Sequence, residues 1–182
     1  GFFDGRGNCN IHINKNDTYE VGYSCSPQIR LTRNRINPIL NSRLSSFLMK
    51  QGIQGNVKTR DDQMFVLQLL ALEDISMLLD IISPYLIQTK ERFDYFQDEI
   101  LPRFRRDDHH TKQGLYEIVK LAEPLFTTSA DQRQYSNQYF EQQWKDDIQI
   151  REPESIIKEP LSGPSKSSKP ETYLPTIEAN VT

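Results

Sequence analysis

Alternating apolar and polar positions near the start of the chain predict a two-stranded β-ribbon. Over residues 8–14 every second residue is apolar, and the residues between them are three asparagines and a histidine. A period of two is typical of a strand that is buried on one side. A turn at residues 15–17 separates this strand from a second alternating stretch over about residues 18–32. Pro27 lies in the apolar register of the second strand and indicates an edge or a bulge.

Helical spacing and a second hairpin follow along the chain. Asn37 and Pro38 predict the start of a helix, because Asn caps helices well and Pro suits the first turn. Gly52 ends that helix, and a hairpin is expected over residues 53–70 with its turn at residues 61–62. The helices expected after the hairpin are one at about 73–82, one that starts at Pro84 and should end at Pro102, and one that Thr111 caps.

The order of these elements predicts an α+β fold. It reads ββα-ββα followed by two more helices, which gives an antiparallel saddle sheet with helices on one face and the other face open. We expect this domain over residues 1–126. A helical extension is expected over residues 127–157, as a single amphipathic helix at 131–148. Residues 158–182 are rich in Pro, Ser and Lys, which is typical of a disordered tail.

The composition excludes several classes of protein. The chain has 182 residues and a mean hydropathy of −0.65. It has no run of about 18 apolar residues, so we expect no membrane span and a cytoplasmic protein. Two cysteines are too few for a disulfide-stapled secreted scaffold. Cys9 and Cys25 fall on the apolar side of the ribbon, where we expect reduced core residues.

Basic residues are concentrated in the first third of the chain. Residues 1–60 carry nine Lys or Arg against three Asp or Glu, a net charge of +6. The remainder carries 13 against 22, a net charge of −9. A basic segment attached to an acidic body is typical of a nucleic-acid-binding face. Local charge imbalance also arises without such a partner, so the pattern alone leaves both interpretations open.

The polar side of the ribbon favours a DNA partner. It is made of amides, an imidazole, hydroxyls and Arg, and its one carboxylate, Glu20, lies near the turn. Asn, Gln and Arg are side chains that read base edges, and a two-stranded ribbon fits the major groove of DNA. Basic residues nearby suit phosphates. The candidate DNA-binding residues are Asn10, His12, Asn14, Lys15, Ser26, Gln28, Arg30, Thr32, Arg33, Lys58 and Arg60.

The residues before the ribbon resemble a known motif. The chain begins Gly-Phe-Phe-Asp-Gly-Arg-Gly-Asn, and the ribbon follows at once. This stretch resembles the end of the LAGLIDADG motif of homing endonucleases, whose common form is LAGFFDGDGS. The similarity covers about residues 1–125 and includes the ββα-ββα order and the helix that opens at Asn37-Pro38. Because Gly1 falls inside the motif, we expect an incomplete motif helix.

The resemblance implies an activity and an assembly. Single-motif members of the family are homodimers that pair their motif helices and cleave long duplex DNA sites with a divalent metal. The expected cofactor is therefore Mg²⁺, and the expected partners are double-stranded DNA and a second copy of the chain, without a membrane. Asp4 matches the first acid of the motif, which shapes the helix end. Asp4 and the carbonyl of Gly5 are the candidate metal ligands, and Lys90, with Thr89 as the competing position, is the candidate basic residue near the scissile phosphate.

Arg6 departs from the family at the position of the metal-binding acid. Mg²⁺ requires hard oxygen ligands, whereas a guanidinium is always protonated and cannot bind a metal. The catalytic set that the resemblance implies, Asp4, Arg6 and Lys90, therefore predicts weak or absent cleavage with DNA binding retained. Two alternatives stay open: a non-catalytic DNA-binding regulator on the same fold, and an RNA-binding maturase that assists intron splicing.

The run Asp107-Asp108-His109-His110 allows two interpretations. Carboxylates and imidazoles are metal ligands, so these consecutive residues could hold a metal ion. They equally suit a solvated loop between two helices, and we expect the loop.

Overall fold

The computed structural model describes residues 2–34, 38–60 and 64–153, and the side chains of Phe2, Arg33, Asn34, Lys58, Thr59 and Arg60 lie outside that description. The elements that open the chain are α1 (Phe2–Arg6), β1 (Gly7–Lys15), β2 (Tyr23–Asn34), α2 (Pro38–Lys50), β3 (Asn56–Arg60) and β4 (Met64–Leu69). The α+β class and the ββα-ββα order are therefore confirmed. The predicted cap at Asn37 and the turn at residues 61–62 lie outside the described residues.

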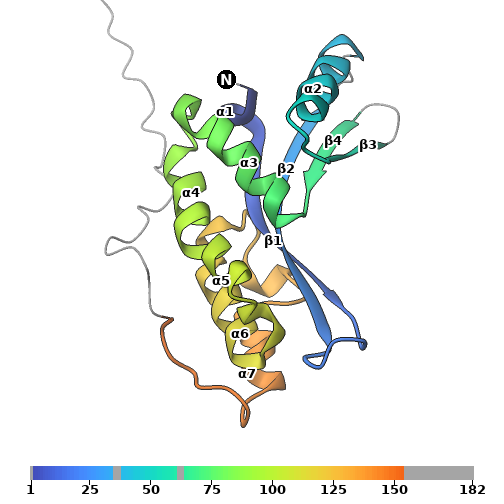
Figure 1. Cartoon of the computed structure of the whole chain (residues 1–182). Coiled ribbons are helices and arrows are strands. Elements are labelled where there is room, and N and C mark those ends of the chain that lie inside the picture. Colours follow the sequence, from blue (N-terminus) through green and yellow to red (C-terminus); the bar gives the residue numbers. More distant parts are fainter. Residues whose placement is uncertain (1, 35–37, 61–63, 154–182) are drawn as a thin grey trace, which may run out of the picture.

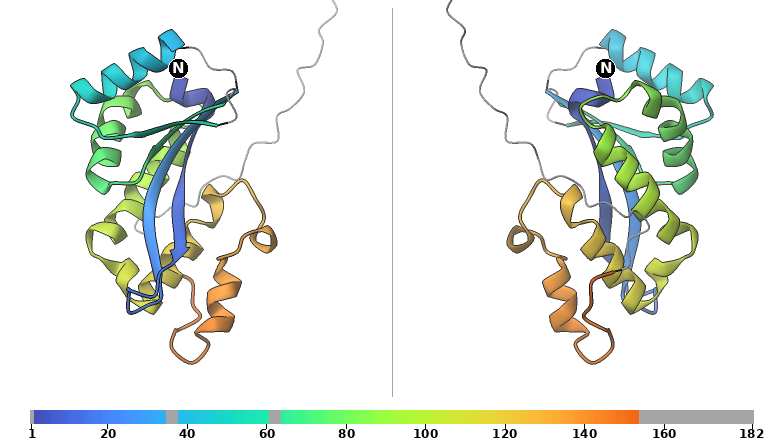
Figure 2. Two further views of the ribbon diagram at one scale, coloured as in Figure 1. Left: turned by 90° about the vertical axis from the view of Figure 1, so that its right-hand side faces the viewer. Right: turned by 90° about the vertical axis from the view of Figure 1, so that its left-hand side faces the viewer.

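One antiparallel sheet organises the molecule, with the strand order β1-β2-β4-β3. Helices cover one of its faces and leave the other bare, as the two views of Figure 2 show. The covering helices are α3 (Leu72–Ile82), α4 (Lys90–Tyr95), α5 (Leu101–Arg105) and α6 (Lys112–Leu121). α2 lies at the β3–β4 end of the sheet, next to α1 and α3 at the same end of the molecule (Figure 1).

The core lies between the sheet and these helices. Every second strand residue faces it, and the sheet residues that are at most 1% exposed are Cys9, Ile29, Leu31, Phe65, Leu67 and Leu69. From α3, Ile75, Leu78 and Leu79 are fully buried against them. Both cysteines are free and buried, as the alternation predicts. In the part of the chain that the structure describes, no helix has the length and apolar character needed to cross a lipid bilayer.

The second strand begins later than its alternation predicts. β2 starts at Tyr23 rather than near residue 18, because residues 16–22 form a closed loop. Asn16 makes this loop: its side-chain Oδ1 accepts from the Thr18 N–H at 3.1 Å, and its own N–H donates to the Gly22 carbonyl at 2.9 Å. Gly22 has a φ of +78°, a conformation that suits glycine. Asn and Gly thus override a short alternating pattern.

Pro102 does not end its helix, contrary to the prediction. α4 continues through a π-helical turn, Phe96–Ile100, directly into α5. Pro102 then occupies the first turn of α5, where its missing N–H is not needed. The wider π turn just before it relieves the clash that a proline ring makes with the preceding turn of an α-helix.

The extension is less helical than predicted but is part of the core. Instead of one helix over 131–148, it contains a 3₁₀ turn, Ala130–Gln132, and α7 (Asn137–Gln143), which Ser136 caps. Phe140, Trp144 and Ile148 are nevertheless buried in the same cluster as the sheet residues. The predicted tail, residues 158–182, lies outside the described residues.

Replacing Trp144 with Ala tests how strongly the extension supports the fold. Trp144 is 5% exposed, and its ring lies 4.6 Å from that of Phe140 and 5.7 Å from that of Tyr23 on β2. Removing a buried aromatic ring leaves a cavity, so we expect a loss of about 3–5 kcal/mol in the free energy of unfolding. Urea denaturation measures it, with Ile150→Ala as the control, since Ile150 is 58% exposed. Equal, small losses of unfolding free energy in both variants would contradict the conclusion that the extension is part of the core.

Candidate nucleic-acid interface

The face of the sheet away from the helices is formed by the even-numbered residues of the four strands, and we call it the bare face. On the ribbon of β1 and β2, Asn10 lies opposite Gln28, and His12 lies opposite Ser26. The register therefore brings the predicted polar residues of both strands together on one surface. None of the four strands contains an Asp or a Glu. The whole sheet is thus free of carboxylates.

One polar row crosses all four strands. Arg30 lies opposite Asn8 on β1 and opposite Gln68 on β4, and Gln68 lies opposite Asn56 on β3. Three of these, Asn8, Gln68 and Asn56, are candidates that the sequence did not single out. The signal was weak, because β4 is apolar on both sides except at Gln68 and its faces could not be assigned without the register.

The residues of the bare face differ in how accessible they are. Arg30 is exposed, Thr32 is half-buried, and Gln28 is only 7% exposed. The amide nitrogen of Asn14 lies 3.0 Å from Nε2 of His12, so these two side chains hold one another at the ribbon's far end. Arg30 is therefore better placed than Gln28 to reach a ligand on this face.

The remaining predicted residues fall at three kinds of position. Lys58 pairs with Val66, and Arg60 pairs with Met64, in the register of the bare face, although their side chains lie outside the description. Arg33 pairs with Phe65, in the register of the helix-covered face. Lys15 is exposed at the last position of β1.

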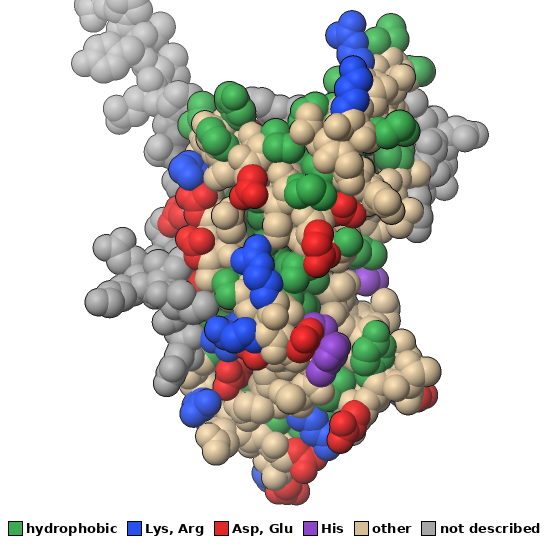
Figure 3. Space-filling model, viewed as in Figure 1, with side chains coloured by type: hydrophobic (Ala, Val, Ile, Leu, Met, Phe, Trp, Pro, Cys, Tyr) green, Lys and Arg blue, Asp and Glu red, His purple; other side chains and the backbone are tan. Residues whose placement is uncertain are grey.

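Charge is distributed differently on the helical side of the molecule. Acidic and basic side chains are interspersed over α3 to α6 in Figure 3, whereas basic side chains line α2. Arg43 and Lys50 are the basic residues of α2, and both are exposed. An anion is therefore attracted by the carboxylate-free sheet and by α2, and much less by the mixed surface of the helical layer.

Asp4 anchors the end of α1 to the segment that precedes α4. Its Oδ1 accepts hydrogen bonds from the backbone N–H groups of Ile87 and Thr89, each at 3.0 Å, and from the Thr89 hydroxyl at 3.2 Å. These donors, above all the Thr89 N–H, hold the pKa of Asp4 below its ordinary value of 3.8 although burial opposes them. Asp4 is therefore an ionised side chain turned into the protein.

The same contact brings the three predicted catalytic residues to one end of the molecule. Gly5 and Arg6 follow Asp4 and are exposed. Lys90 follows Thr89 and opens α4, where its Nζ lies 2.8 Å from Oδ2 of Asp94. The two residues of this ion pair are one helical turn apart and exposed to solvent. The Lys90 ammonium therefore stays accessible to an anion.

The residues at the end of α1 offer few ligands to a divalent cation such as Mg²⁺. That ion is usually held by one or two carboxylates together with waters and phosphate oxygens. Oδ1 of Asp4 already accepts three hydrogen bonds, and Arg6 offers only donors. The second carboxylate oxygen of Asp4 and the carbonyl of Gly5 are then the oxygens left from the predicted ligand pair. A phosphate, by contrast, suits Arg6 and Lys90.

Comparisons with known proteins point to one family and one fold. The family model described as LAGLIDADG endonuclease matches residues 1–99 of the chain. No curated protein sequence matches the chain.

Solved structures with the same fold are homing endonucleases. One is the crystal structure of a homing endonuclease, I-TnaI, at 21% identity and a TM-score of 0.61, covering 80% of this chain and 92% of that one. Another is I-SmaMI bound to cleaved DNA, at 21% identity and a TM-score of 0.59, covering 86% of this chain and 50% of that one. A third is I-CvuI in complex with the I-CreI target, at 18% identity and a TM-score of 0.62, covering 80% and 88%. The chain thus spans nearly the whole of I-TnaI but about half of I-SmaMI.

Asp4→Asn tests the anchor through its dependence on pH. Because hydrogen bonds lower the pKa of Asp4 in the folded state, its carboxylate stabilises the fold above pH 3.8, and this contribution disappears as the pH falls through the folded pKa. We expect wild type to be more stable than the variant at neutral pH and the gap to close below pH 3.8. Urea unfolding of both proteins across this range measures the gap. A gap that stays constant would mean that the charge of Asp4 is not what anchors α1.

Proposed function

Because the chain belongs to the LAGLIDADG endonuclease family, we propose that it binds a specific site in duplex DNA through the bare face of its sheet. The observation that carries this proposal is the absence of any carboxylate from four strands whose even-numbered residues include Asn, Gln, Ser, Thr, His and Arg. A face that merely meets water has no reason to exclude Asp and Glu. A face that lies along phosphates does, because each carboxylate would be repelled.

The proposed division of labour follows from side-chain chemistry. Arg30, at the centre of the polar row, suits a guanine edge, and the amides beside it, Asn8 and Gln68, suit adenine. The amide oxygens of Asn8 and Asn10 are buried and accept no hydrogen bond from residues 2–34, 38–60 and 64–153. Binding to DNA would therefore break no hydrogen bond at these two oxygens. Arg43 and Lys50 on α2 suit phosphates.

The proposed assembly is a homodimer. The chain spans about half of I-SmaMI, so two copies would match the length of that chain. An apolar hollow of about 360 Å³ lies at the same end of the molecule as α1, lined among others by Phe3, Phe47 and Tyr85. Tyr85 of this lining is 75% exposed, and Ile87, two residues further along the chain, is 83% exposed. Exposed apolar groups around a hollow mark an interaction surface, and pairing through the motif helix would cover this one.

The proposed activity is binding with weak or absent cleavage. Hydrolysis of a phosphodiester needs an activated water and neutralisation of the phosphate, which a bound metal ion supplies in this family. Arg6 places a cation where the ligand is needed, and Asp4 is held by Ile87 and Thr89. A DNA-binding regulator is accordingly the second candidate, and Arg6 is the residue that favours it.

Selection from a pool of random duplexes tests the function as a whole. The full chain should enrich one long, near-palindromic sequence and bind it as a dimer, as sedimentation of the complex would show. Recovery of no common sequence would overturn specific recognition. Stronger binding to structured RNA than to the selected duplex would favour the maturase alternative.

Arg30→Ala tests the bare face directly. The variant loses the central guanidinium of the polar row, so we expect binding to the selected duplex to weaken by about 1–3 kcal/mol. The matched control is Arg105→Ala, because Arg105 is exposed on α5, in the opposite layer, and carries the same charge. Fluorescence anisotropy at fixed salt compares the two. Equal losses would show that total charge, not the bare face, governs affinity.

Arg6→Asp tests the missing acid. It supplies a carboxylate where the family has its metal ligand, so we expect Mg²⁺- or Mn²⁺-dependent nicking of the selected duplex to rise above the wild-type level. Arg6→Ala is the control, since it removes the positive charge without adding a ligand, and it should not gain activity. Nicking of a supercoiled plasmid that carries the site measures both. No gain in Arg6→Asp would count against the role assigned to this position.

A further inference from the structure

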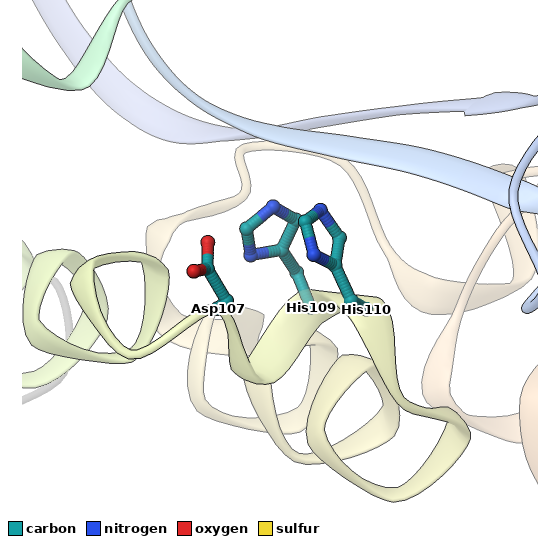
Figure 4. A group of neighbouring side chains, drawn as sticks. All are labelled: Asp107, His109 and His110. Atoms are coloured by element: carbon teal, nitrogen blue, oxygen red, sulfur yellow. The ribbon is translucent and has the colours of Figure 1, made fainter.

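A carboxylate and two imidazoles meet on the connection between α5 and α6. Asp107, His109 and His110 each offer one ligand atom, and these atoms all lie within 4.8 Å of one another. In Figure 4 the three side chains project to the same side of the turn, and a ring nitrogen of His109 faces the Asp107 carboxylate. The sequence favoured a solvated loop here, but the fold brings the three groups together.

The three groups are not committed to other partners. Arg106 pairs with Asp108, at 3.0 Å, and not with Asp107. In the part of the chain that the structure describes, the Asp107 carboxylate makes no hydrogen bond or ion pair, and Nδ1 of His109 is buried without a hydrogen-bond partner. A neutral imidazole has the lone pair that a metal requires.

The backbone that carries the cluster is already fixed. Asp107 has a φ of +59°, a left-handed conformation that bends the chain sharply, and its carbonyl accepts from the His110 N–H at 3.0 Å. The next carbonyl, of Asp108, accepts from the Thr111 N–H at 3.1 Å. Gly114 packs directly beneath, where a Cβ would lie 2.1 Å from that carbonyl oxygen. A bound metal ion would therefore have to order only the side chains of the cluster and not its backbone, which lowers the entropic cost of binding.

The rings of the cluster are also supported from both sides. The ring of His109 packs against Phe104 of α5 at 5.0 Å between centroids. The ring of His110 lies 5.9 Å from that of Tyr19, in the loop between β1 and β2. The cluster thus lies where the helical layer meets the tip of the ribbon.

Two imidazoles and one carboxylate are the donor set of a late first-row transition metal such as Zn²⁺. Mg²⁺ prefers a full set of oxygen ligands, so this cluster does not suit the Mg²⁺ ion that is expected for the family's cleavage reaction. We infer that Asp107, His109 and His110 form a Zn²⁺-type metal site that ties the turn between α5 and α6 together under the tip of the ribbon. Water fills the coordination positions that the protein leaves open.

Titration calorimetry of the full chain with ZnCl₂ tests the site. We expect one ion per chain, and a loss of at least about tenfold in affinity for Asp107→Asn, His109→Gln and His110→Gln. The chain offers matched controls in Asp108→Asn and in His12→Gln, the one other histidine, and both should bind as wild type does. The two cysteines do not compete, because both are buried, and burial raises the pKa of Cys9 to about 12.

A second measurement keeps the test independent of folding. Thermal unfolding without metal identifies any variant that is merely unfolded, and added ZnCl₂ should raise the melting temperature of wild type and His12→Gln but not of His109→Gln. In NMR spectra, Zn²⁺ should shift the imidazole signals of His109 and His110 and leave those of His12 in place. The inference is overturned if wild type binds no Zn²⁺, if the three cluster variants bind it as well as wild type, or if only His12 responds.

Discussion

The register in which β1 pairs with β2 is the constraint on which both faces of the sheet depend. In this register even-numbered residues meet even-numbered partners, as Asn10 meets Gln28, and odd-numbered residues face the helices. A slip by one residue would turn the amides inward and expose Cys9 and Ile29, which are at most 1% exposed in the fold. The helices therefore hold the register through the core. The burial of the apolar residues therefore also fixes the polar face, because any change of register would change both faces at once.

A second constraint joins the start of the chain to its middle. Asp4 and Thr89 are far apart in the sequence, and a single carboxylate oxygen with three donors links α1 to the start of α4. Such charge-assisted hydrogen bonds are stronger than neutral ones and need the carboxylate to stay ionised. The hydrogen bonds that fix the end of α1 therefore engage Oδ1 of the acid that precedes Arg6. The same carboxylate is the acid that the family resemblance offers as a metal ligand, so folding and metal binding would draw on one side chain.

The fold could be predicted from the sequence wherever the spacing of apolar residues, or a capping residue, pointed to a single type of element. The alternation at residues 8–14 became β1, and the Thr111 cap became the start of α6 with its Oγ1 accepting from the Gly114 N–H. Predictions were wrong where a local backbone preference competed: Asn16 and Gly22 replaced the start of a strand with a loop, and a π turn carried a helix past Pro102. For the site, the ribbon residues could be named, but Asn56 and Gln68 could not. Their place in the polar row depends on how β3, β4 and β2 are paired, and that pairing is set by tertiary contacts that no local pattern encodes.

Binding and cleavage draw on this fold in unequal ways. In the proposed function, recognition by the bare face would be spread over many side chains, each with a small share of the binding free energy, so the loss of any one would weaken binding without abolishing it. Cleavage of the kind proposed for the family would depend on a metal ion at one position, and binding of that ion would depend on the sign of one charge. A single substitution such as the one at Arg6 can therefore remove the reaction while leaving the sheet, its register and its carboxylate-free surface untouched. The same guanidinium that cannot hold a metal is a good partner for a phosphate. On the proposed function, the substitution that weakens cleavage would thus add to the attraction for DNA, which is the direction in which a nuclease becomes a DNA-binding protein.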